Sequence, residues 1–213
     1  DGLLRLRYVT SHPRDMRDDL IRAHRDNPKL MPYLHLPIQS GSDRILAAMN
    51  RRHRAKDYLA LVERIRDCVP AIALSTDVIV GFPGETDADF KATIDLVERV
   101  GFAQGYSFKY SARPGTPAAL LDDAVAAAVQ QERLARLQAL IDRQQSTFNA
   151  ATVGKKLPVL FDRQGRRHGQ IVGKTPYLQS VHAQGTTLLI GTLSTVEIVD
   201  RQRNSLGGVI IGP

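Results

Sequence analysis

Apolar residues recur along residues 3–110 in two alternating patterns, one typical of strands and one typical of helices. The short apolar or alternating runs predict strands over residues 4–9, 33–38, 73–80 and 105–110. Stretches with apolar residues three or four positions apart predict helices over residues 14–25, 42–49, 57–68 and 87–100. Strands that alternate with helical crossovers predict a parallel α/β array. A complete (β/α) barrel needs about twice this number of strands, so the array corresponds to part of a barrel.

The pattern changes after residue 120. Leu134, Leu137, Ile141 and Phe148 follow one another at helical spacings, which predicts a long amphipathic helix to about Ala151. Short β-like runs separated by glycine then predict a small antiparallel barrel, with strands over residues 157–161, 168–173, 186–190 and 196–199. We therefore expect three parts: part of a (β/α) barrel over residues 1–120, a connecting helix over 121–153 and a small β-barrel over 154–213.

Composition narrows the class of protein. The hydrophobic content of 43% suits a soluble globular chain, and no apolar run is long enough to cross a membrane. The first residues lack the layout of a signal peptide, so we expect a cytoplasmic protein. Cys68 is the single cysteine, which excludes an internal disulfide framework and a cysteine-only metal cage within this chain.

Charge is unevenly distributed along the chain. The formal net charge is +7, of which +5 falls on residues 151–213, a segment with eight Lys/Arg and three acidic residues. A small basic module beside a nearly neutral one indicates a polyanionic partner, most often nucleic acid. The alternative is charge that serves only solubility.

The segment from Leu74 to Thr86 is the most informative of the chain. The buried-strand pattern ends in a turn that contains Gly81 and Gly84, where the backbone can adopt conformations closed to other residues. Thr86 and Asp89 have the spacing of a capping box, which predicts a helix start near residue 87. Ligands of parallel α/β proteins bind at the carboxyl ends of strands, so this loop marks a candidate site. It is not a P-loop, because it lacks the Gly-Lys-Ser/Thr ending.

Two further polar stretches follow predicted strands or helices. Gln39 and Ser40 come directly after the strand that ends at Ile38, where their side chains can hydrogen-bond a ligand, and Ser42 can cap the next helix. A well-capped turn explains this stretch equally well. The basic stretch at 49–52 suits the dipole of a helix end, and an exposed basic helix end is the simpler reading.

Asp77 and Glu85 are candidates for an acid–base pair, although a structural role for Glu85 at a helix N-terminus is favoured. Tyr110 and Arg113 follow the last predicted strand and can hold an aromatic ring and a carboxylate, since the planar guanidinium binds both carboxylate oxygens. An ordinary loop is the alternative. The six histidines show no metal-ligand spacing, and Cys68 is read as a packing residue.

Four motifs follow one another along the chain: His35-Leu-Pro-Ile-Gln-Ser-Gly-Ser-Asp43, Met49-Asn-Arg51, Asp77-Val-Ile-Val-Gly-Phe-Pro-Gly-Glu-Thr86 and Phe108-Lys-Tyr-Ser-Ala-Arg-Pro-Gly-Thr116. Together they resemble the radical S-adenosylmethionine methylthiotransferases, and the MiaB-like tRNA branch fits better than the branch that modifies a ribosomal protein. The resemblance covers essentially the whole chain, with residues 151–213 similar to the TRAM barrel, an RNA-binding module.

The resemblance implies a full-length enzyme with two 4Fe–4S clusters that methylthiolates C2 of an N6-isopentenyl-type adenosine next to the tRNA anticodon, using S-adenosylmethionine. The cysteines that hold the clusters in that family are absent from this chain. We therefore expect a fragment or a natural truncation that is inactive alone and provides no metal ligands. A ribosomal-protein methylthiotransferase and a non-catalytic RNA-binding module remain the alternatives.

The family match also gives the strand-end residues an expected place. Gln39, Ser40, Ser42 and Asp77 are expected to line the side of S-adenosylmethionine, with Tyr110 and Arg113 near the cofactor or the target base. On the β-barrel, the expected contacts with phosphates of the tRNA anticodon stem-loop are the cations Arg163, Arg166, Arg167 and Lys174. Tyr177 and Phe161 are candidates for stacking on unpaired bases, although core packing suits Phe161 equally well.

Overall fold

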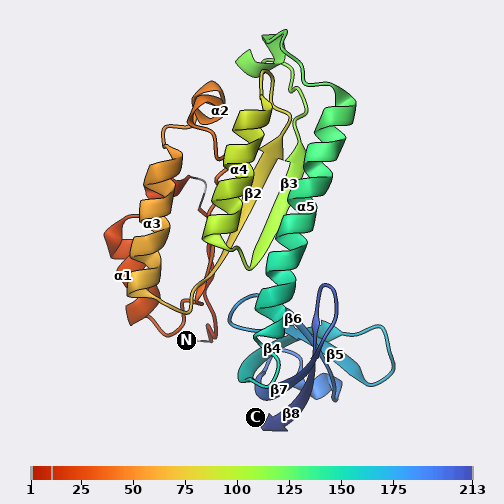
Figure 1. Cartoon of the computed structure of the whole chain (residues 1–213). Helices are drawn as coiled ribbons and strands as arrows, with labels where there is room; N and C mark the ends of the chain where they lie inside the picture. Colours follow the sequence, from red (N-terminus) through yellow and green to blue (C-terminus); the bar gives the residue numbers. More distant parts are fainter. Residues whose placement is uncertain (1, 11, 213) are drawn as a thin grey trace. The chain divides into compact units, whose positions relative to one another are not determined.

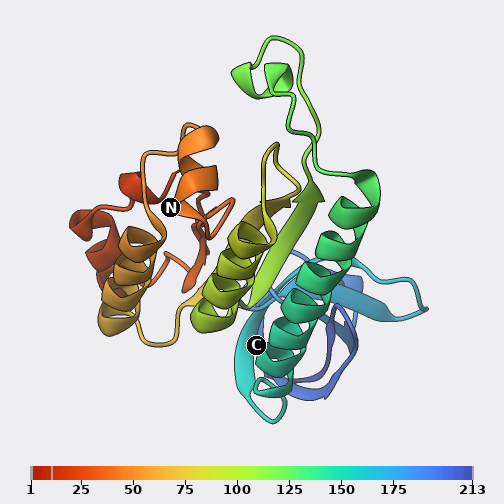
Figure 2. The same ribbon diagram turned by 45° about the horizontal axis from the view of Figure 1, so that its top comes forward.

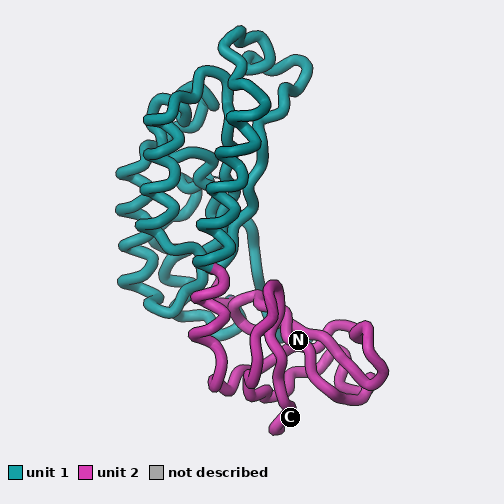
Figure 3. Tube along the Cα trace, turned by 45° about the vertical axis from the view of Figure 1, so that its right-hand side comes forward, with its two compact units in different colours: residues 1–30, 34–144 teal, residues 31–33, 145–213 magenta. Residues whose placement is uncertain are grey.

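The computed structural model of the chain describes residues 2–10 and 12–212. It divides into two compact units, one of residues 1–30 and 34–144 and the other of residues 31–33 and 145–213 (Figure 3). The long helix predicted at the junction is observed as α5 (Ala127–Ala150), and the division between the units falls inside it, after Gln144.

The first unit is built on a three-stranded sheet. Its strands are β1 (Tyr33–His35), β2 (Ala73–Val80) and β3 (Gln104–Lys109), in the order β1-β2-β3. β2 and β3 are parallel and in register from Ser75 opposite Gln104 to Val80 opposite Lys109. The parallel α/β array is therefore confirmed for β2 and β3, and a parallel bridge from Gln39 to Val78 extends it to the segment after β1.

Helices cover one face of this sheet, as Figures 1 and 2 show for α3 (Ala55–Cys68), α4 (Asp87–Val100) and α5. Side chains of β2 that point to this face pack with apolar residues of the helices in one core, for example Leu74 and Val78 with Ile65 and Val97. The capping box of Thr86 and Asp89 forms as predicted, and α4 begins at residue 87. Ser42 likewise caps α2 (Asp43–Ala48).

Two predictions for the first forty residues are wrong in detail. The strand predicted at 4–9 forms only isolated parallel bridges, from Leu6 to Leu30 and from Val9 to His35. Prolines at 32 and 37 flank the neighbouring strand β1 and lack the N–H that a ladder requires, so β1 itself is short and a continuous partner does not form. The helix predicted at 14–25 is divided into a 3₁₀ turn, η1 (Pro13–Asp15), and α1 (Asp18–Asp26).

The second unit is a closed five-stranded barrel with strand order β4-β5-β6-β8-β7, which confirms the predicted small β-barrel. Contrary to expectation, the barrel is not antiparallel throughout, because β6 and β8 pair in parallel. Its strands are β4 (Lys156–Gln164), β5 (Gln170–Lys174), β6 (Ser180–Gln184), β7 (Leu193–Arg201) and β8 (Leu206–Gly212). Its core contains Val159, Phe161, Val181, Val196 and Leu206.

The predicted strand at 186–190 is wrong, because residues 187–189 form a 3₁₀ turn, η3 (Thr187–Leu189), with Leu188 84% exposed. β6 and β8 were not predicted. β6 has small and polar residues, and β8 contains three glycines, which are depleted in strands. Gly208 explains one of them, because a Cβ there would overlap the side chain of Val196.

Candidate ligand site at the carboxyl edge of the sheet

The loop from Gly81 to Thr86 joins the carboxyl end of β2 to α4. Gly81 and Gly84 have φ of +70° and +73°, the left-handed region that favours glycine. A Cβ at Gly81 would also overlap the side chain of Gln130 on α5, whose Nε2 donates to the Gly81 carbonyl at 3.2 Å. The loop therefore lies close to α5, an approach that is possible because residue 81 has no side chain.

A buried ion pair fixes the same loop. Arg133 Nη1 lies 2.8 Å from Glu85 Oε1, with side-chain exposures of 4% and 1%. Arg133 also donates to the Glu85 carbonyl at 3.0 Å and to Asp87 Oδ1 at 2.6 Å, while the Gly81 N–H donates to Glu85 Oε1 at 3.1 Å. Burial raises the pKa of Glu85, and the hydrogen bond from Gly81 and the charge of Arg133 oppose the rise. Glu85 is thus a structural residue, as favoured above, and its partner Arg133 was missed in the sequence.

Asp89 joins this loop to the loop that follows β1. Its carboxylate accepts hydrogen bonds from Ser42 Oγ at 2.6 Å, from the Thr86 hydroxyl at 2.6 Å and from the Thr86 N–H at 2.9 Å. Arg44 forms an ion pair with it and also donates to the Gly84 carbonyl at 2.6 Å. Burial opposes ionisation, but the hydrogen bonds from Arg44, Ser42 and Thr86 outweigh it and hold the pKa of Asp89 well below its usual range.

Gln39 has a backbone conformation unusual for its residue type, with φ of +71°. The position is held by β2, because the Gln39 N–H donates to the Asp77 carbonyl and the Gln39 carbonyl accepts from the Ile79 N–H, both at 2.9 Å. Strained residues of this kind cluster at functional sites.

The hydroxyls of Ser40 and Ser42 are occupied within the protein. Ser40 Oγ is fully buried, lies 3.3 Å from Thr93 Oγ1 and accepts from the Ser42 N–H at 3.2 Å. Ser42 caps α2 and donates to Asp89. Between them, Gly41 packs against the backbone of α4 so closely that a Cβ would lie 2.5 Å from the Ala92 carbonyl oxygen. These serines hold the loop in place.

The sheet face opposite to the helix-packed core carries Asp77. His35 links to two residues of β2, with Nδ1 2.9 Å from Ser75 Oγ and Nε2 3.4 Å from Asp77 Oδ2. Register places Asp77 opposite Tyr106, and Tyr106 and Phe108 are 44% and 51% exposed. This face therefore presents a carboxylate, an imidazole and two aromatic rings, of which sequence reasoning found only Asp77.

Tyr110 lies beside the Gly81–Thr86 loop. Its N–H donates to the Val80 carbonyl at 2.8 Å, and its ring packs edge-to-face on Phe82 at 5.0 Å. The Tyr110 hydroxyl is buried and has no hydrogen-bond partner among the described residues. Arg113 is exposed in the following loop, where its carbonyl accepts from the Thr116 hydroxyl at 2.8 Å. The structure thus brings Tyr110 to the candidate site, and no described contact ties the Arg113 side chain to it.

The basic residues predicted on the β-barrel differ in their surroundings. Arg166 and Arg167 are exposed between β4 and β5, Arg163 pairs with Asp162 at 2.6 Å, and Lys174 donates to Ser180 Oγ at 2.6 Å. Phe161 is fully buried in the barrel core, so core packing is the correct alternative for it. Tyr177 is half-buried and packs edge-to-face on Phe148 at 5.9 Å.

Comparison with known proteins identifies similar sequences. The Radical SAM superfamily profile matches residues 1–97. A tRNA-2-methylthio-N(6)-dimethylallyladenosine synthase of Sphingopyxis alaskensis is 58% identical over 207 residues, which are 97% of this chain and 47% of the relative. A protein of the same name from Jannaschia sp. is 57% identical over 211 residues, 99% of this chain and 46% of the relative. The chain thus spans about half the length of these curated relatives.

A solved structure supports the fold. Coproporphyrinogen III oxidase (HemN) from Escherichia coli, a radical SAM enzyme, aligns with a TM-score of 0.53 over 78% of this chain and 45% of that chain, at 14% identity. At this identity the likeness concerns the fold alone. No helix in the described residues is long and apolar enough to span a membrane.

Proposed function

We propose that the chain, which over nearly its whole length is similar to part of the tRNA-2-methylthio-N(6)-dimethylallyladenosine synthases, supplies one side of the cofactor site and an RNA-binding barrel to a radical S-adenosylmethionine enzyme of this kind. The observation that carries the proposal is the 57–58% identity over 97–99% of the chain. The proposed activity of the whole protein is methylthiolation of C2 of an N6-isopentenyl-type adenosine next to the anticodon.

Iron–sulfur clusters do not fit the residues of this chain. Cys68 is its only cysteine, and no three His, Cys, Asp or Glu residues among those described are grouped to hold a metal. Clusters of this kind need about four thiolate or histidine ligands. In our proposal the chain alone is therefore inactive, and the ligands come from the other half of the enzyme.

S-adenosylmethionine fits the carboxyl edge better. Gln39 and Tyr110 follow β1 and β3, while Asp77 lies within β2 on the sheet face, where it can accept hydrogen bonds from ribose hydroxyls. The buried Tyr110 hydroxyl has no described partner, which leaves one unused hydrogen-bonding group at this edge. In this proposal Ser40 and Ser42 act through the loop that they hold, and Arg113 lies near the cofactor or the target base.

The β-barrel is proposed to bind the anticodon stem-loop of tRNA. Its support is the net charge of +5 on residues 151–213 and the exposed arginines between β4 and β5. The proposed phosphate contacts are those of Arg163, Arg166, Arg167 and Lys174, and removal of any one of these cations should reduce the salt dependence of binding by about one unit of log–log slope.

Calorimetry tests the site. The chain is joined to the complementary half of the Sphingopyxis alaskensis relative, and Gln39→Ala and Arg113→Ala are compared with the parent for binding of S-adenosylmethionine and of tRNA. We expect weaker cofactor binding for Gln39→Ala and weaker binding of cofactor or tRNA for Arg113→Ala. Unchanged affinities would remove both residues from the site. Supplying a ribosomal protein in place of tRNA tests the sister activity, which would be favoured if only the protein became methylthiolated.

A further inference from the structure

Three arginines at the carboxyl edge of the first unit surround a histidine, outside the loops described above. Arg14 belongs to η1, and Arg51 and Arg52 belong to the connection between α2 and α3. We call these three residues the arginine cluster. They lie close enough to His12 to act on its pKa, which is lowered first by burial and then by the charge of Arg51. Asp15 opposes this, and Arg14 and Arg52 add smaller effects that lower the pKa.

His12 and His53 form a neutral support under the cluster. The Arg14 N–H donates to His12 Nδ1 at 3.1 Å, and His12 Nε2 lies 3.4 Å from His53 Nδ1. Because His12 Nδ1 accepts a hydrogen bond, its Nε2 carries the hydrogen that faces His53. Burial lowers the pKa of His53 to about 4, and smaller interactions with His12 and Arg51 act in the same direction. At neutral pH the positive charge of this surface therefore comes from the arginines.

Asp15 neighbours Arg14 in η1, and two other carboxylates near the cluster accept hydrogen bonds from backbone N–H groups. Asp57 accepts from the Arg54 N–H at 3.2 Å, and Asp43 accepts from the Ala55 N–H at 2.7 Å, so both serve the start of α3. Arg14 and Arg52 are exposed, and neither has a salt bridge within residues 2–10 and 12–212. The two guanidinium groups are thus available to an anion.

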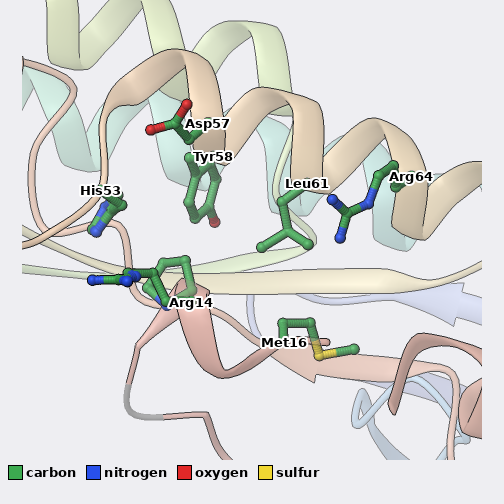
Figure 4. A pocket seen from close by; sticks show the side chains of 8 residues that line it. Arg14, Met16, His53, Asp57, Tyr58, Leu61 and Arg64 are labelled. Carbon is green, nitrogen blue, oxygen red and sulfur yellow. The ribbon is translucent and has the colours of Figure 1, made fainter. Parts of the chain in front are cut away.

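The surface is hollowed beside Arg14. The hollow has a volume of about 240 Å³, with Met16 and Leu61 among its apolar lining residues. Figure 4 shows Arg14 and His53 toward one end and Arg64 toward the other. Arg64 pairs with Asp18 at 2.9 Å, so Arg14 is the guanidinium of this rim without a described carboxylate partner. Asp57 also lines the hollow, so the group here that can contact a phosphate is Arg14 at the rim.

The position of the cluster relates it to the candidate site. The chain before η1 runs parallel to β1 through the bridge from Val9 to His35, so η1 follows at the carboxyl edge. The connection between α2 and α3 also lies at this end, and Figure 1 shows α2 at the same end of the sheet as the loops after β2 and β3. A nucleotide whose base enters the candidate site must bring its phosphates across this edge.

We propose that the arginine cluster is a second phosphate-binding surface for RNA, carried by the unit that holds the candidate site and not by the β-barrel. The proposal rests on the proposed function, from which the RNA is identified as the anticodon stem-loop of tRNA. Its recognition chemistry is that of guanidinium groups with phosphate oxygens, independent of base sequence. The cluster would position the backbone on either side of the target nucleotide.

The test compares two double variants of the full chain. Arg14→Gln with Arg52→Gln removes two charges from the cluster, and Arg25→Gln with Arg99→Gln removes two charges from the last turns of α1 and α4, away from the carboxyl edge. Arg25 and Arg99 are exposed and pair with Asp26 and Glu63. Binding of a labelled anticodon stem-loop and of inorganic polyphosphate is measured across a salt series, with thermal melting to verify folding.

For RNA, the cluster variant should reduce the log–log salt slope by about 1.5 units, and the control variant should leave it unchanged. Equal salt slopes for the parent and the cluster variant would overturn the proposal. If the parent still binds RNA in that case, the proposed function is not affected. Binding of polyphosphate through the cluster, with no RNA binding by the parent, would instead contradict the proposed function and limit the surface to a general anion site.

Discussion

Arg133 is the only described cation paired with the buried Glu85, so removing its charge should strongly destabilise the Gly81–Thr86 loop. In Arg133→Met the apolar stem remains while the guanidinium is lost. Breaking a buried pair by removing one partner costs about 3–5 kcal/mol, because the other charge is left uncompensated. We expect Arg133→Met to lose stability in this range at pH 8.

The stability loss in Arg133→Met should depend on pH through the protonation of Glu85. Burial already raises the pKa of Glu85, and loss of Arg133 removes a group that opposes the rise. The folded variant then binds a proton that the unfolded chain releases above about pH 4.3. Its stability must fall as pH rises from that value through the folded pKa of Glu85. The loss caused by Arg133→Met should therefore be smaller at pH 5 than at pH 8.

Urea unfolding followed by amide hydrogen exchange of β2 and α4 measures this effect in the first unit alone. Arg143→Met on the same helix is the matched control, because the exposed Arg143–Glu98 contact of 3.4 Å should contribute less than about 1 kcal/mol. Adding Glu85→Gln to Arg133→Met should recover part of the loss by removing the second charge. A cost below about 1 kcal/mol that is independent of pH would refute the assigned role of the pair.

Three further predictions concern the loops and the barrel. Asp89→Asn should cost about 2–3 kcal/mol at pH 7 in urea unfolding, since charge-assisted hydrogen bonds to Asp89 are weakened. Because the folded pKa of Asp89 is lowered, this difference should shrink as pH falls below about 3.9, and a constant difference would contradict it. Gly41→Ala should destabilise the first unit by about 1–3 kcal/mol, because the added Cβ meets the α4 backbone; normal melting would show that the loop can shift. Phe161→Ala should cost about 3–5 kcal/mol in barrel stability and reduce RNA binding only through unfolding, and weakened RNA binding by a barrel of unchanged stability would oppose its core role.

Local sequence signals predicted those parts of the fold whose causes are local. The apolar run at 78–80 and the capping box of Thr86 and Asp89 each lie within a few residues, and the structure has β2 and α4 where they indicate. Strands that depend on distant neighbours were harder to predict. One of the glycines of β8, Gly208, is required because it lies against Val196, and only the closed barrel reveals that contact.

The same distinction applies to the candidate site. The motif after β2 located the loop. Arg133 follows Glu85 by 48 residues, and nothing in the sequence around it distinguishes it from a solvent-exposed arginine of a helix, so the pair could not be predicted. His35 likewise meets Asp77 only because β1 and β2 are neighbours in the sheet. Ser40 and Ser42 have the residue types of ligand contacts, yet their hydroxyls are bound within the protein.

The most direct test of the central claim is the mass of the nucleosides from tRNA incubated with S-adenosylmethionine and reductant. The chain is supplied either alone or joined to the complementary half of its Sphingopyxis alaskensis relative with reconstituted clusters. We predict 2-methylthio-N6-isopentenyladenosine from the joined protein and unmodified nucleosides from the chain alone. Methylthiolated adenosine from the chain alone would contradict the assignment of the cluster ligands to the other half. Its absence from a cluster-loaded joined protein would contradict the proposed activity.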